Sequence, residues 1–312
     1  MNNSNGMSVD NKTDLDSIVT KAFLDLEEIE VNLYRGSNLF RPVGSRIVFG
    51  GQVVGQALVA AIKTLPPDYL AHSLHSYFLK GGSYEQPIVY HVDRTREGNT
   101  YCSRSVKAVQ NGSPIFTMQA SFKKEESDPF EHQFTMPHVP EPENLMNTTE
   151  ILQQVLKFPN ISQRQQDYIH KRLAEDITVE MRPANKDEYI MQKSLAPKQC
   201  TWVRAIGHIG DDVQMHQCVA AYISDTILLR AAILPAGMNN AVSPKRFMMM
   251  SLDHSIWFHN LMHTNEWMLY EAESPFCGGG RSLVLGRLWR RDGVLAMSVA
   301  QEGVIRTLKS QL

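Results

Sequence analysis

Cysteine is scarce in this sequence, and its few cysteines are far apart. They are Cys102, Cys200, Cys218 and Cys277, and no two of them form a C-x-x-C pair. This spacing argues against a zinc ribbon and against a small disulfide-bonded scaffold, because both need cysteines at short, paired intervals. It favours a protein of a reducing compartment.

The chain also lacks an excess of either charge and a long apolar run. Its 31 Lys and Arg residues are balanced by 33 Asp and Glu residues, so we expect no binding of nucleic acid. No run reaches the roughly 18 apolar residues that a spanning helix needs, so we predict no membrane span. The first residues, MNNSNGMSVDNKTD, contain neither the basic nor the apolar region of a secretory signal. We therefore predict a soluble protein that is not secreted.

What the sequence does contain is enough apolar material for a large core. Of its 312 residues, 43% are hydrophobic, which suits two modest domains or one large one. Residues 1–17 are polar and are predicted to form a disordered leader. Residues 131–176, with a Pro-rich piece and a Gln-rich piece that is predicted to be helical over 151–173, are interpreted as a connector between an N-terminal unit, 18–130, and a C-terminal unit, 177–312.

The two units show the same order of elements. In the first, Gly50 and Gly51 precede an apolar helical run that ends at Pro66, and glycine- and asparagine-containing turns separate the strands that follow. Those strands are predicted at 72–80, 87–94, 101–110 and 114–124. In the second unit a helix over 216–234 follows strands at 177–182 and 200–206 and precedes strands at 249–258, 266–273, 282–291 and 294–306. A duplication explains this order, with each half forming an antiparallel sheet wrapped round one central helix.

One carboxylate, Asp225, stands in the otherwise apolar helix of the second unit. On a helix its neighbours one turn away are Ala221, Tyr222, Leu228 and Leu229, so it projects from an apolar surface. An unpaired charge there is costly. Asp225 is therefore either a structural acid satisfied by a neighbouring group or a working group in a site.

Four motifs stand in a fixed order along the chain. They are Val48–Leu58, Tyr222–Asp225, Ser251–His259 and Asp292–Ala296, the last followed by Ala300–Val304. In this order and at this spacing they resemble the type II acyl-CoA thioesterases, in particular the peroxisomal eukaryotic members. The resemblance implies an α+β double hotdog fold and hydrolysis of fatty acyl-CoA to free fatty acid and CoA.

The resemblance also implies the site residues. Carried over by motif, the catalytic set is Asp225, Ser251 and Gln301, with Ser at a position that is often Thr in bacterial relatives. An Asp, a hydroxyl and an amide can hold one water, with the Asp taking its proton, because a thioester is already electrophilic and thiolate leaves readily. Candidates for oxyanion or substrate binding are the residues at the start of the first central helix, Gly50, Gly51 and Gln52.

Other interpretations stay open at this point. Taken singly, Gln301, Ser251 and the Gly50-Gly51 pair each fit a structural role better than a role in a site. Taken together, in motif order, they favour a site. A hotdog enoyl-CoA hydratase or dehydratase and a non-catalytic acyl-CoA binding module are the alternative functions. The first half has Gln56, His72 and Ala120 near the equivalent positions, which suggests that one half kept the chemistry.

We expect neither a metal nor a cofactor. His254, His259 and His263 suggest a metal site only superficially, because their spacing lacks the Glu of a zincin helix.

The last residues bear on localisation and partners. Ser310, Gln311 and Leu312 differ from a Ser-Lys-Leu peroxisomal signal only at the middle residue. With the family resemblance, this favours the peroxisomal matrix, reached through an import receptor, over the cytoplasm. The resemblance further implies a homodimer or a higher homo-oligomer, with acyl-CoA as the substrate.

Overall fold

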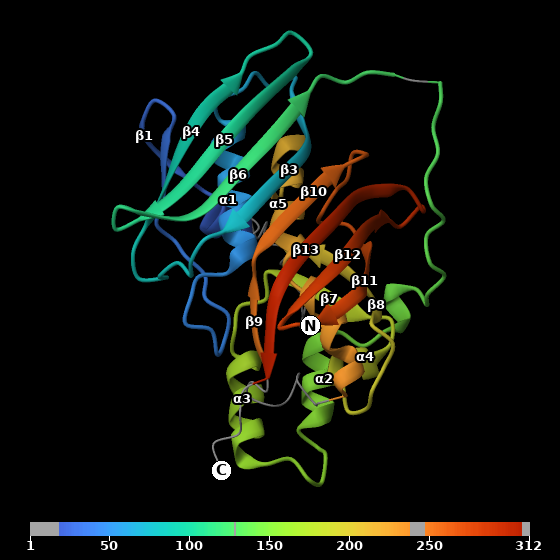
Figure 1. Cartoon of the computed structure of the whole chain (residues 1–312). Helices are drawn as coiled ribbons and strands as arrows, with labels where there is room; N and C mark the ends of the chain where they lie inside the picture. The colour runs from blue at the N-terminus through green and yellow to red at the C-terminus, as the bar shows by residue number, and fades with distance from the viewer. Residues whose placement is uncertain (1–18, 128, 238–246, 308–312) are drawn as a thin grey trace, which may run out of the picture.

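Two apolar helices, α1 (Gly50–Ile62) and α5 (Val213–Ser224), lie side by side within the curve of one antiparallel sheet (Figure 1). The computed structural model describes residues 19–127, 129–237 and 247–307. The strands of the first half are β1 (Glu27–Glu30), β2 (Leu33–Gly36), β3 (Leu70–Phe78), β4 (Ile88–Arg96), β5 (Tyr101–Gln110) and β6 (Ser113–Lys123). Those of the second half are β7 (Val179–Pro183), β8 (Lys198–Ala205), β9 (Phe247–Ser251), β10 (Asp253–Phe258), β11 (Met268–Gly278), β12 (Arg281–Arg290) and β13 (Leu295–Thr307).

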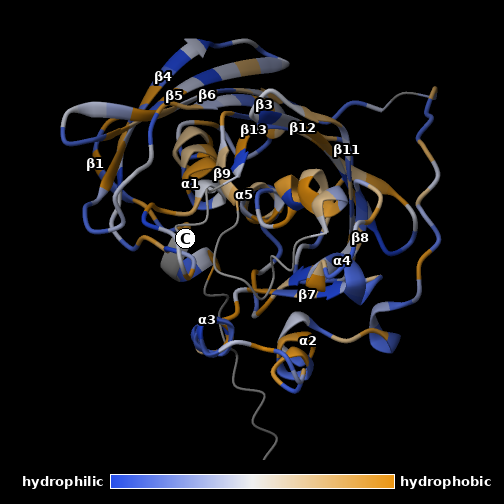
Figure 2. Cartoon of the chain, turned by 60° about the horizontal axis from the view of Figure 1, so that its bottom comes forward, coloured by the Kyte–Doolittle hydropathy of each residue, from blue (hydrophilic) through white to orange (hydrophobic). Residues whose placement is uncertain are grey.

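All these strands belong to a single sheet. Within the described ranges its order is β1-β2-β4-β5-β6-β3-β10-β13-β12-β11-β8-β7, and β9 pairs with β13. The first six strands curve round α1, and the last seven curve round α5 and the helical turns that follow it (Figure 2). This arrangement confirms the predicted α+β architecture. Each half is an antiparallel sheet wrapped round a central helix, and the two sheets join edge to edge into one.

Helices α1 and α5 pack closely because α1 presents glycines to α5. A Cβ at Gly51 would lie 2.5 Å from the carbonyl oxygen of Tyr222, and one at Gly55 would lie 3.3 Å from that of Cys218. These glycines are four residues apart and therefore share one face of α1. The ring of Phe49, at the N-cap of α1, packs edge-on against the Tyr222 ring at 5.1 Å. The N-terminus of α1 thus lies against the C-terminus of α5.

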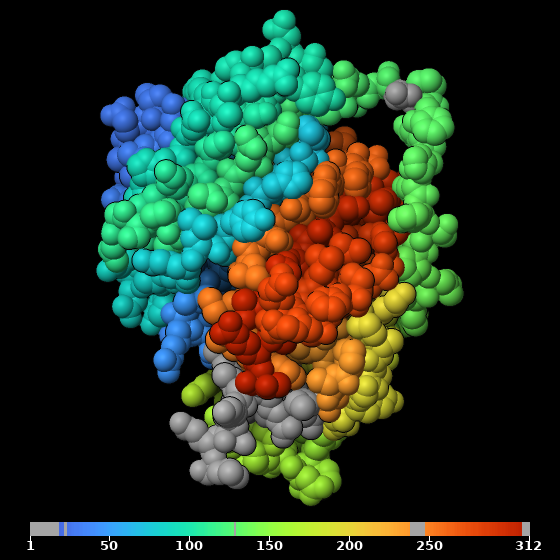
Figure 3. Space-filling model, viewed as in Figure 1, coloured from blue at the N-terminus to red at the C-terminus, as the bar shows by residue number. Residues whose placement is uncertain are grey.

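The two halves join along the pair of strands β3 and β10, which meet as a diagonal seam on the surface (Figure 3). His75 lies opposite Ser255 at the middle of this antiparallel pair. A second link crosses from α5: the side chain of Gln217 donates to Ala71 O at 2.7 Å, and its Oε1 accepts from Ala71 N at 3.0 Å. Each half therefore satisfies backbone groups and covers a sheet edge of the other.

The connector runs outside the sheet as an extended segment and then forms helices (Figure 1, Figure 3). We predicted one helical piece, 151–173, but the structure contains two helices, because a second N-cap, Ser162, starts a new one. Both begin with a capping box, in which the N-cap side chain and the third helical residue bond each other's backbone. The remaining helical elements are η1 (Val19–Phe23), η2 (Pro142–Asn144), α2 (Thr148–Val155), α3 (Gln163–Leu173), α4 (Lys186–Ile190) and η3 (Leu228–Ala236).

The helix that carries Asp225 is shorter than predicted. We expected one helix over 216–234, with Asp225 in its middle, but α5 ends at Ser224, Asp225 is its C-cap, and the tighter helix η3 follows. The segment Val213–Ala236 as a whole is apolar and long enough to cross a membrane, yet 72% of its most apolar stretch is buried inside the molecule. We interpret it as core rather than as a span.

Buried side chains explain this break. Tyr270 on β11 donates its hydroxyl to Ser224 O at 2.6 Å, and Gln199 on β8 donates its amide to Ile227 O at 2.7 Å. These bonds satisfy carbonyls that a continuous helix would pair internally. The carboxylate is therefore placed at a helix end, where the backbone turns away from it.

Candidate active site

Three polar side chains converge where the C-terminus of α5 meets β9 and β13. Gln301 Nε2 donates to Asp225 Oδ1 at 2.8 Å and to Ser251 Oγ at 2.6 Å. The Ser251 hydroxyl in turn donates to Asp225 Oδ1 at 3.4 Å. Ser251 reaches this point because it lies at the end of β9, opposite Gly303 on β13. The structure thus brings together the three residues that the resemblance implied.

The N-terminus of α1 contacts the same carboxylate. The backbone N–H of Gly51 donates to Asp225, and a Cβ at Gly50 would lie 2.7 Å from Asp225 Oδ2. A side chain at Gly50 would therefore collide with the carboxylate. The positive end of the α1 dipole favours the ionised form of Asp225. Gly50 and Gly51, expected as oxyanion or substrate contacts, lie at the site and hold the carboxylate.

Burial dominates the electrostatics of Asp225. Removal from water raises the pKa of this carboxyl to about 6, and the hydrogen bonds from Gln301, from the Gly51 backbone and from Ser251 act in the opposite direction. A carboxyl with a pKa near 6 is largely ionised at neutral pH and is still a much stronger base than an exposed Asp. This balance suits a group that removes a proton from water.

The side chain of Gln52 anchors the loop that precedes α1. Its side chain is buried in α1, where Nε2 donates to Asn38 O at 2.7 Å and Oε1 accepts from Phe40 N at 2.7 Å. Both ends of the amide are therefore committed to the loop that precedes the helix. Because the buried polar atoms of the side chain already hold the backbone of that loop, the expected role of Gln52 in oxyanion or substrate binding concerns its backbone N–H, and it stays a prediction.

Apolar side chains border the polar group. A Cβ at Gly50 would also lie 3.2 Å from the ring of Phe78, and one at Gly303 would lie 2.8 Å from the side chain of Leu229. Phe78 ends β3 and Leu229 belongs to η3, so both halves contribute to this border. A carboxylate with apolar walls suits a substrate that joins a polar reacting group to a hydrocarbon chain.

The first half provides an internal control. A two-fold axis through the His75–Ser255 pair relates Ala71 to Ser251, and it relates Ala120, the partner of Leu74, to Gln301. The equivalent of the C-cap Asp225 is Lys63, the C-cap of α1. The first half therefore lacks all three polar groups.

Two first-half residues named from the sequence have other roles. Gln56 lies inside α1 and accepts a hydrogen bond from Tyr90, and His72 pairs with Ser121. His72 is adjacent to Ala71, the equivalent of Ser251, as predicted, whereas Gln56 lies about two turns before Lys63, the equivalent of Asp225.

A buried guanidinium fills the corresponding end of the first half. Arg104 on β5 is fully buried beside Ala120. Its Nε donates to Thr64 Oγ1 at 2.7 Å, one residue beyond the C-cap of α1, and its guanidinium pairs with Glu97 at 2.8 Å. The first half thus has a buried guanidinium, bonded to the residue after the helix C-cap, beside the alanine that is equivalent to Gln301.

One histidine that was named above only as a possible metal ligand lies beside the site. His254, on β10, is fully buried behind Gln301. His259 instead bonds Ser298, and His263 stacks edge-on against His216. In the part of the chain that the structure describes, no three His, Cys, Asp or Glu side chains are arranged to hold a metal ion.

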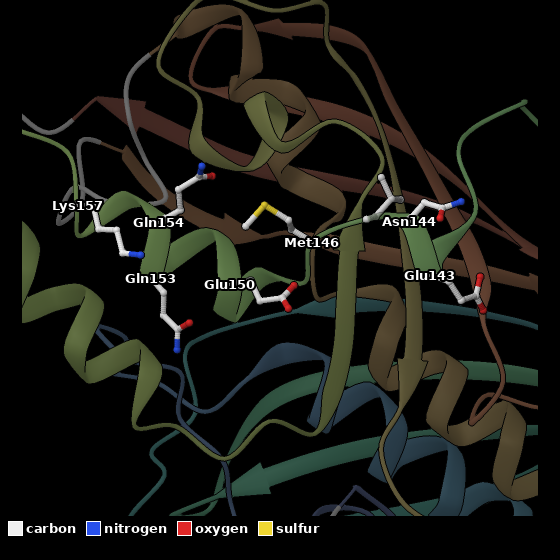
Figure 4. Close-up of a pocket in the computed structure, with 8 residues that line it drawn as sticks. Glu143, Asn144, Met146, Glu150, Gln153, Gln154 and Lys157 are labelled. Atoms are coloured by element: carbon white, nitrogen blue, oxygen red, sulfur yellow. The ribbon is translucent and has the colours of Figure 1, made fainter.

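A separate hollow of about 560 Å³ lies in the connector (Figure 4). It is lined by Glu143, Asn144, Leu145, Met146, Glu150, Gln153, Gln154 and Lys157. Glu143 is held in an ion pair with Arg291 at 2.8 Å. This hollow contains no convergent acid, hydroxyl and amide, so its size alone does not make it the candidate site.

Comparisons with known proteins agree with this geometry. A model of the acyl-CoA thioesterase family matches residues 171–304, and a model of the acyl-CoA thioesterase N-terminal domain matches residues 40–123. The chain is 47% identical to acyl-coenzyme A thioesterase 8 of Homo sapiens, over 94% of this chain and 90% of the relative. It is 28% identical to peroxisomal acyl-coenzyme A thioester hydrolase 1 of Saccharomyces cerevisiae, over 85% of this chain and 87% of the relative.

A solved structure supports the fold. The acyl-CoA thioesterase II of Mycobacterium marinum superposes with a TM-score of 0.71 at 35% identity, covering 92% of this chain and 98% of that one. The double hotdog fold implied by the sequence motifs is thereby confirmed. From the two family models, the sequence identity and the shared fold, we conclude that this chain belongs to the acyl-CoA thioesterase family.

Proposed function

We propose that this acyl-CoA thioesterase hydrolyses fatty acyl-CoA with one water, which Asp225 deprotonates and which Ser251 and Gln301 orient. The observation that supports this proposal is the convergence of a buried carboxylate, a hydroxyl and an amide within 2.6 to 3.4 Å of one another. Because the three groups are bonded to one another at one helix end among apolar side chains, they form a fixed polar surface against which a water is held in one position.

The reaction then needs no covalent intermediate with the protein. Asp225 takes a proton from the water as the oxygen attacks the thioester carbonyl carbon. The tetrahedral intermediate collapses with cleavage of the C–S bond, and the electron pair of that bond leaves with the sulfur of CoA. The proton on Asp225 returns to the thiolate, so the products are a fatty acid and CoA thiol and the carboxylate is regenerated.

The N-terminus of α1 is suited to stabilise the charge that develops. The carbonyl oxygen becomes negative in the intermediate, and a helix N-terminus offers a positive potential to an anion. Gly50 and Gly51 let the carboxylate come close to this terminus. When Asp225 accepts a proton during the attack, it loses its own negative charge. This favours the new negative charge on the carbonyl oxygen in the same region.

The geometry favours hydrolysis over hydration or dehydration of an enoyl thioester. Such an enzyme uses an acid and base on either side of the Cα–Cβ bond, commonly Asp with His. His254, which lies behind Gln301, is fully buried and is separated from Asp225 by that amide. A non-catalytic binding module would not need a carboxyl whose pKa is raised to about 6.

The test is Asp225→Asn, which preserves the volume and removes the base. We expect the turnover rate with a panel of acyl-CoAs, followed by release of free thiol, to fall by roughly 100-fold or more, the scale of general-base loss. Substrate affinity should barely change. An Asp225→Asn protein that is destabilised but remains fully active would show that Asp225 is only a structural acid, and enoyl-CoA hydration by the parent would favour the alternative enzyme.

We also propose that the protein works in the peroxisomal matrix. The name of the yeast relative supports this location, and Ser310, Gln311 and Leu312, the expected import-receptor signal, lie outside the described residues. An N-terminally tagged protein should give a punctate signal that deletion of these three residues makes diffuse. A diffuse signal from the intact protein would contradict the location.

We further propose a homodimer or a larger homo-oligomer. Tyr77 and Trp257 leave apolar surface exposed on the outer face of the seam between β3 and β10, where a second copy could cover it. Light scattering coupled to size exclusion should give at least twice the chain mass of 35.3 kDa. A monomer at high concentration would exclude the oligomer.

A further inference from the structure

Two buried polar atoms beside the site lack a hydrogen bond of ordinary geometry. They are Oε1 of Gln301 and Nδ1 of His254, and both residues are fully buried. Gln301 follows Ala300, which pairs with Ser255, so Gln301 lies opposite His254 on the adjacent strand. The amide of Gln301 also favours the protonated form of the imidazole. The two atoms are therefore each other's available partners.

The chemistry of Asp225 fixes which way the Gln301 amide points. A carboxylate only accepts hydrogen bonds, so the amide must turn its NH₂ group toward Asp225 Oδ1, as the 2.8 Å contact shows. The carbonyl oxygen of the same amide then faces away from Asp225 and toward β10. A buried carbonyl there needs a donor, and the Nδ1 atom of His254 is the atom in position to supply one.

The far side of the imidazole completes the chain. His254 Nε2 lies 2.7 Å from Ser224 Oγ, at the last residue of α5. Burial lowers the pKa of His254 to about 4, so at neutral pH the ring carries one N–H. The Ser224 hydroxyl has one hydrogen and two acceptors within reach, Ala221 O at 2.8 Å and Nε2. If the ring hydrogen is on Nδ1, the hydroxyl turns to donate to Nε2, and each group in the chain has a defined donor or acceptor role.

The first half shows that this histidine accompanies the polar group. The two-fold axis that relates Ala120 to Gln301 relates Leu74 to His254. Where the amide is absent, the residue behind it is therefore apolar. A core position that needed only packing would accept Leu in both halves, since both are fully buried.

We propose that His254 is a positioning residue for hydrolysis: its Nδ1–H holds Gln301 Oε1, so that the Gln301 NH₂ group stays directed at Asp225 and Ser251. The proposal rests on the function proposed above. His254 touches neither water nor substrate in this account and acts only through Gln301. Ser224 contributes by holding the Nε2 side of the ring.

Two amide substitutions separate the contacts of the two ring nitrogens. The nitrogen of Asn is as far from the backbone, in bonds, as His Nδ1, and the nitrogen of Gln is as far as His Nε2. His254→Asn therefore retains a donor for Gln301 and loses the contact with Ser224, whereas His254→Gln does the reverse. We expect kcat to fall within about threefold for Asn and at least about tenfold for Gln, since loss of orientation slows turnover. KM should change little in either.

A double-substitution experiment tests the route through Gln301. In a Gln301→Ala background, His254→Gln should cause no further loss of kcat, because the amide it positions is gone. Ser76→Ala is the matched control: Ser76 is buried on β3 and donates to the backbone carbonyl of His254 at 2.8 Å, so it perturbs the same strand pair without touching the ring. It should lower the melting temperature and leave kcat unchanged. Equal losses for Asn and Gln, or multiplied losses with Gln301→Ala, would overturn the proposal.

The ring itself provides a measurement that does not depend on the variants folding. In protein labelled with ¹⁵N-histidine, the resonances of His254, identified by their absence from a folded variant or by their persistence at low pH, should show the hydrogen on Nδ1. A hydrogen on Nε2 would refute the proposal. If Gln301→Ala and Asp225→Asn were fully active, the proposed site itself would fail. If they were inactive while His254→Gln was fully active, only the role of His254 would fail.

Discussion

Gly50 of α1 and the carboxylate of Asp225 are so close that a Cβ on Gly50 would lie 2.7 Å from Oδ2. No heavy atom occupies such a position without displacement of its neighbour. The contact joins the start of the central helix of one half to the end of the central helix of the other, so the position of the proposed catalytic carboxylate depends on how the halves pack.

We predict that Gly50→Ala lowers kcat by about tenfold or more, because displacement of a reacting group by about 1 Å has effects of this size. Stability should change little, since Ala is a better helix former than Gly by about 1 kcal/mol and offsets part of the strain. The matched control is Gly55→Ala, one turn further along α1, whose Cβ would lie 2.8 Å from Leu24. It should lower the melting temperature and leave kcat unchanged. If Gly55→Ala lowered kcat and Gly50→Ala did not, the contact between Gly50 and Asp225 would have no part in the reaction.

Substitutions of the two orienting groups should not add. Ser251→Ala and Gln301→Ala each remove one member of the same hydrogen-bonded group that orients the water, so the double variant should be little slower than the poorer single variant. Ser251→Thr keeps the hydroxyl and should retain most of the activity. Steady-state rates of the four proteins with one acyl-CoA test this, and fully multiplicative losses would mean that the residues act separately.

The pKa of Asp225 sets opposite pH trends for activity and stability. The base must be ionised, so kcat/KM should rise with pH up to about 6 and then level off. In the unfolded chain the pKa is near 3.8, and burial raises it to about 6 in the fold. A raised pKa means that the contribution of this group to stability is fully present below pH 4 and is lost as pH rises through 6.

Asp225→Asn should therefore be more stable than the parent above pH 6, by up to about 3 kcal/mol, and equal to it near pH 4. Urea unfolding of both proteins across this range measures the difference. A difference that is constant with pH would show that the carboxyl does not titrate in this way.

The link made by Gln217 should matter for stability and not for chemistry. Gln217→Ala leaves the backbone N–H and carbonyl of Ala71 buried without their partners, which costs about 1–3 kcal/mol for each group. Gln214→Ala, on the less buried turn before it, removes a single bond to Tyr69 O and should cost less. Thermal unfolding of the two variants compares these costs, and a smaller loss for Gln217→Ala would contradict the assignment.

The fold could be predicted because its signals are local. The Asn111-Gly112 and Asp292-Gly293 turns were visible as letters, and Asn111, Gly112 and Gly293 have the positive φ that such turns require. The apolar run after Gly50-Gly51 likewise became α1. The motif order then supplied the arrangement that local patterns alone leave open.

The details of the site could not be predicted because they depend on distant side chains. The sequence cannot show that Tyr270 and Gln199 take the carbonyls that end α5, and so Asp225 was expected in the middle of a longer helix. Gln52 was expected only as part of the start of the first central helix. That its side-chain amide holds the preceding loop depends on backbone groups more than ten residues away. His254 belongs to the motif Ser251–His259, but its position opposite Gln301 follows only from the register of β10 and β13.

The buried guanidinium of Arg104 has a consequence for stoichiometry. A duplicated chain with two opposed helices has two equivalent ends, and each could in principle bind one substrate. Because the buried Arg104, bonded to Thr64, lies at one of these ends, we expect each 35.3 kDa chain to carry a single reaction centre, and titration with a tight-binding acyl-CoA analogue should saturate at one molecule per chain. The first half then contributes to the site only part of its apolar border and the N-terminus of α1.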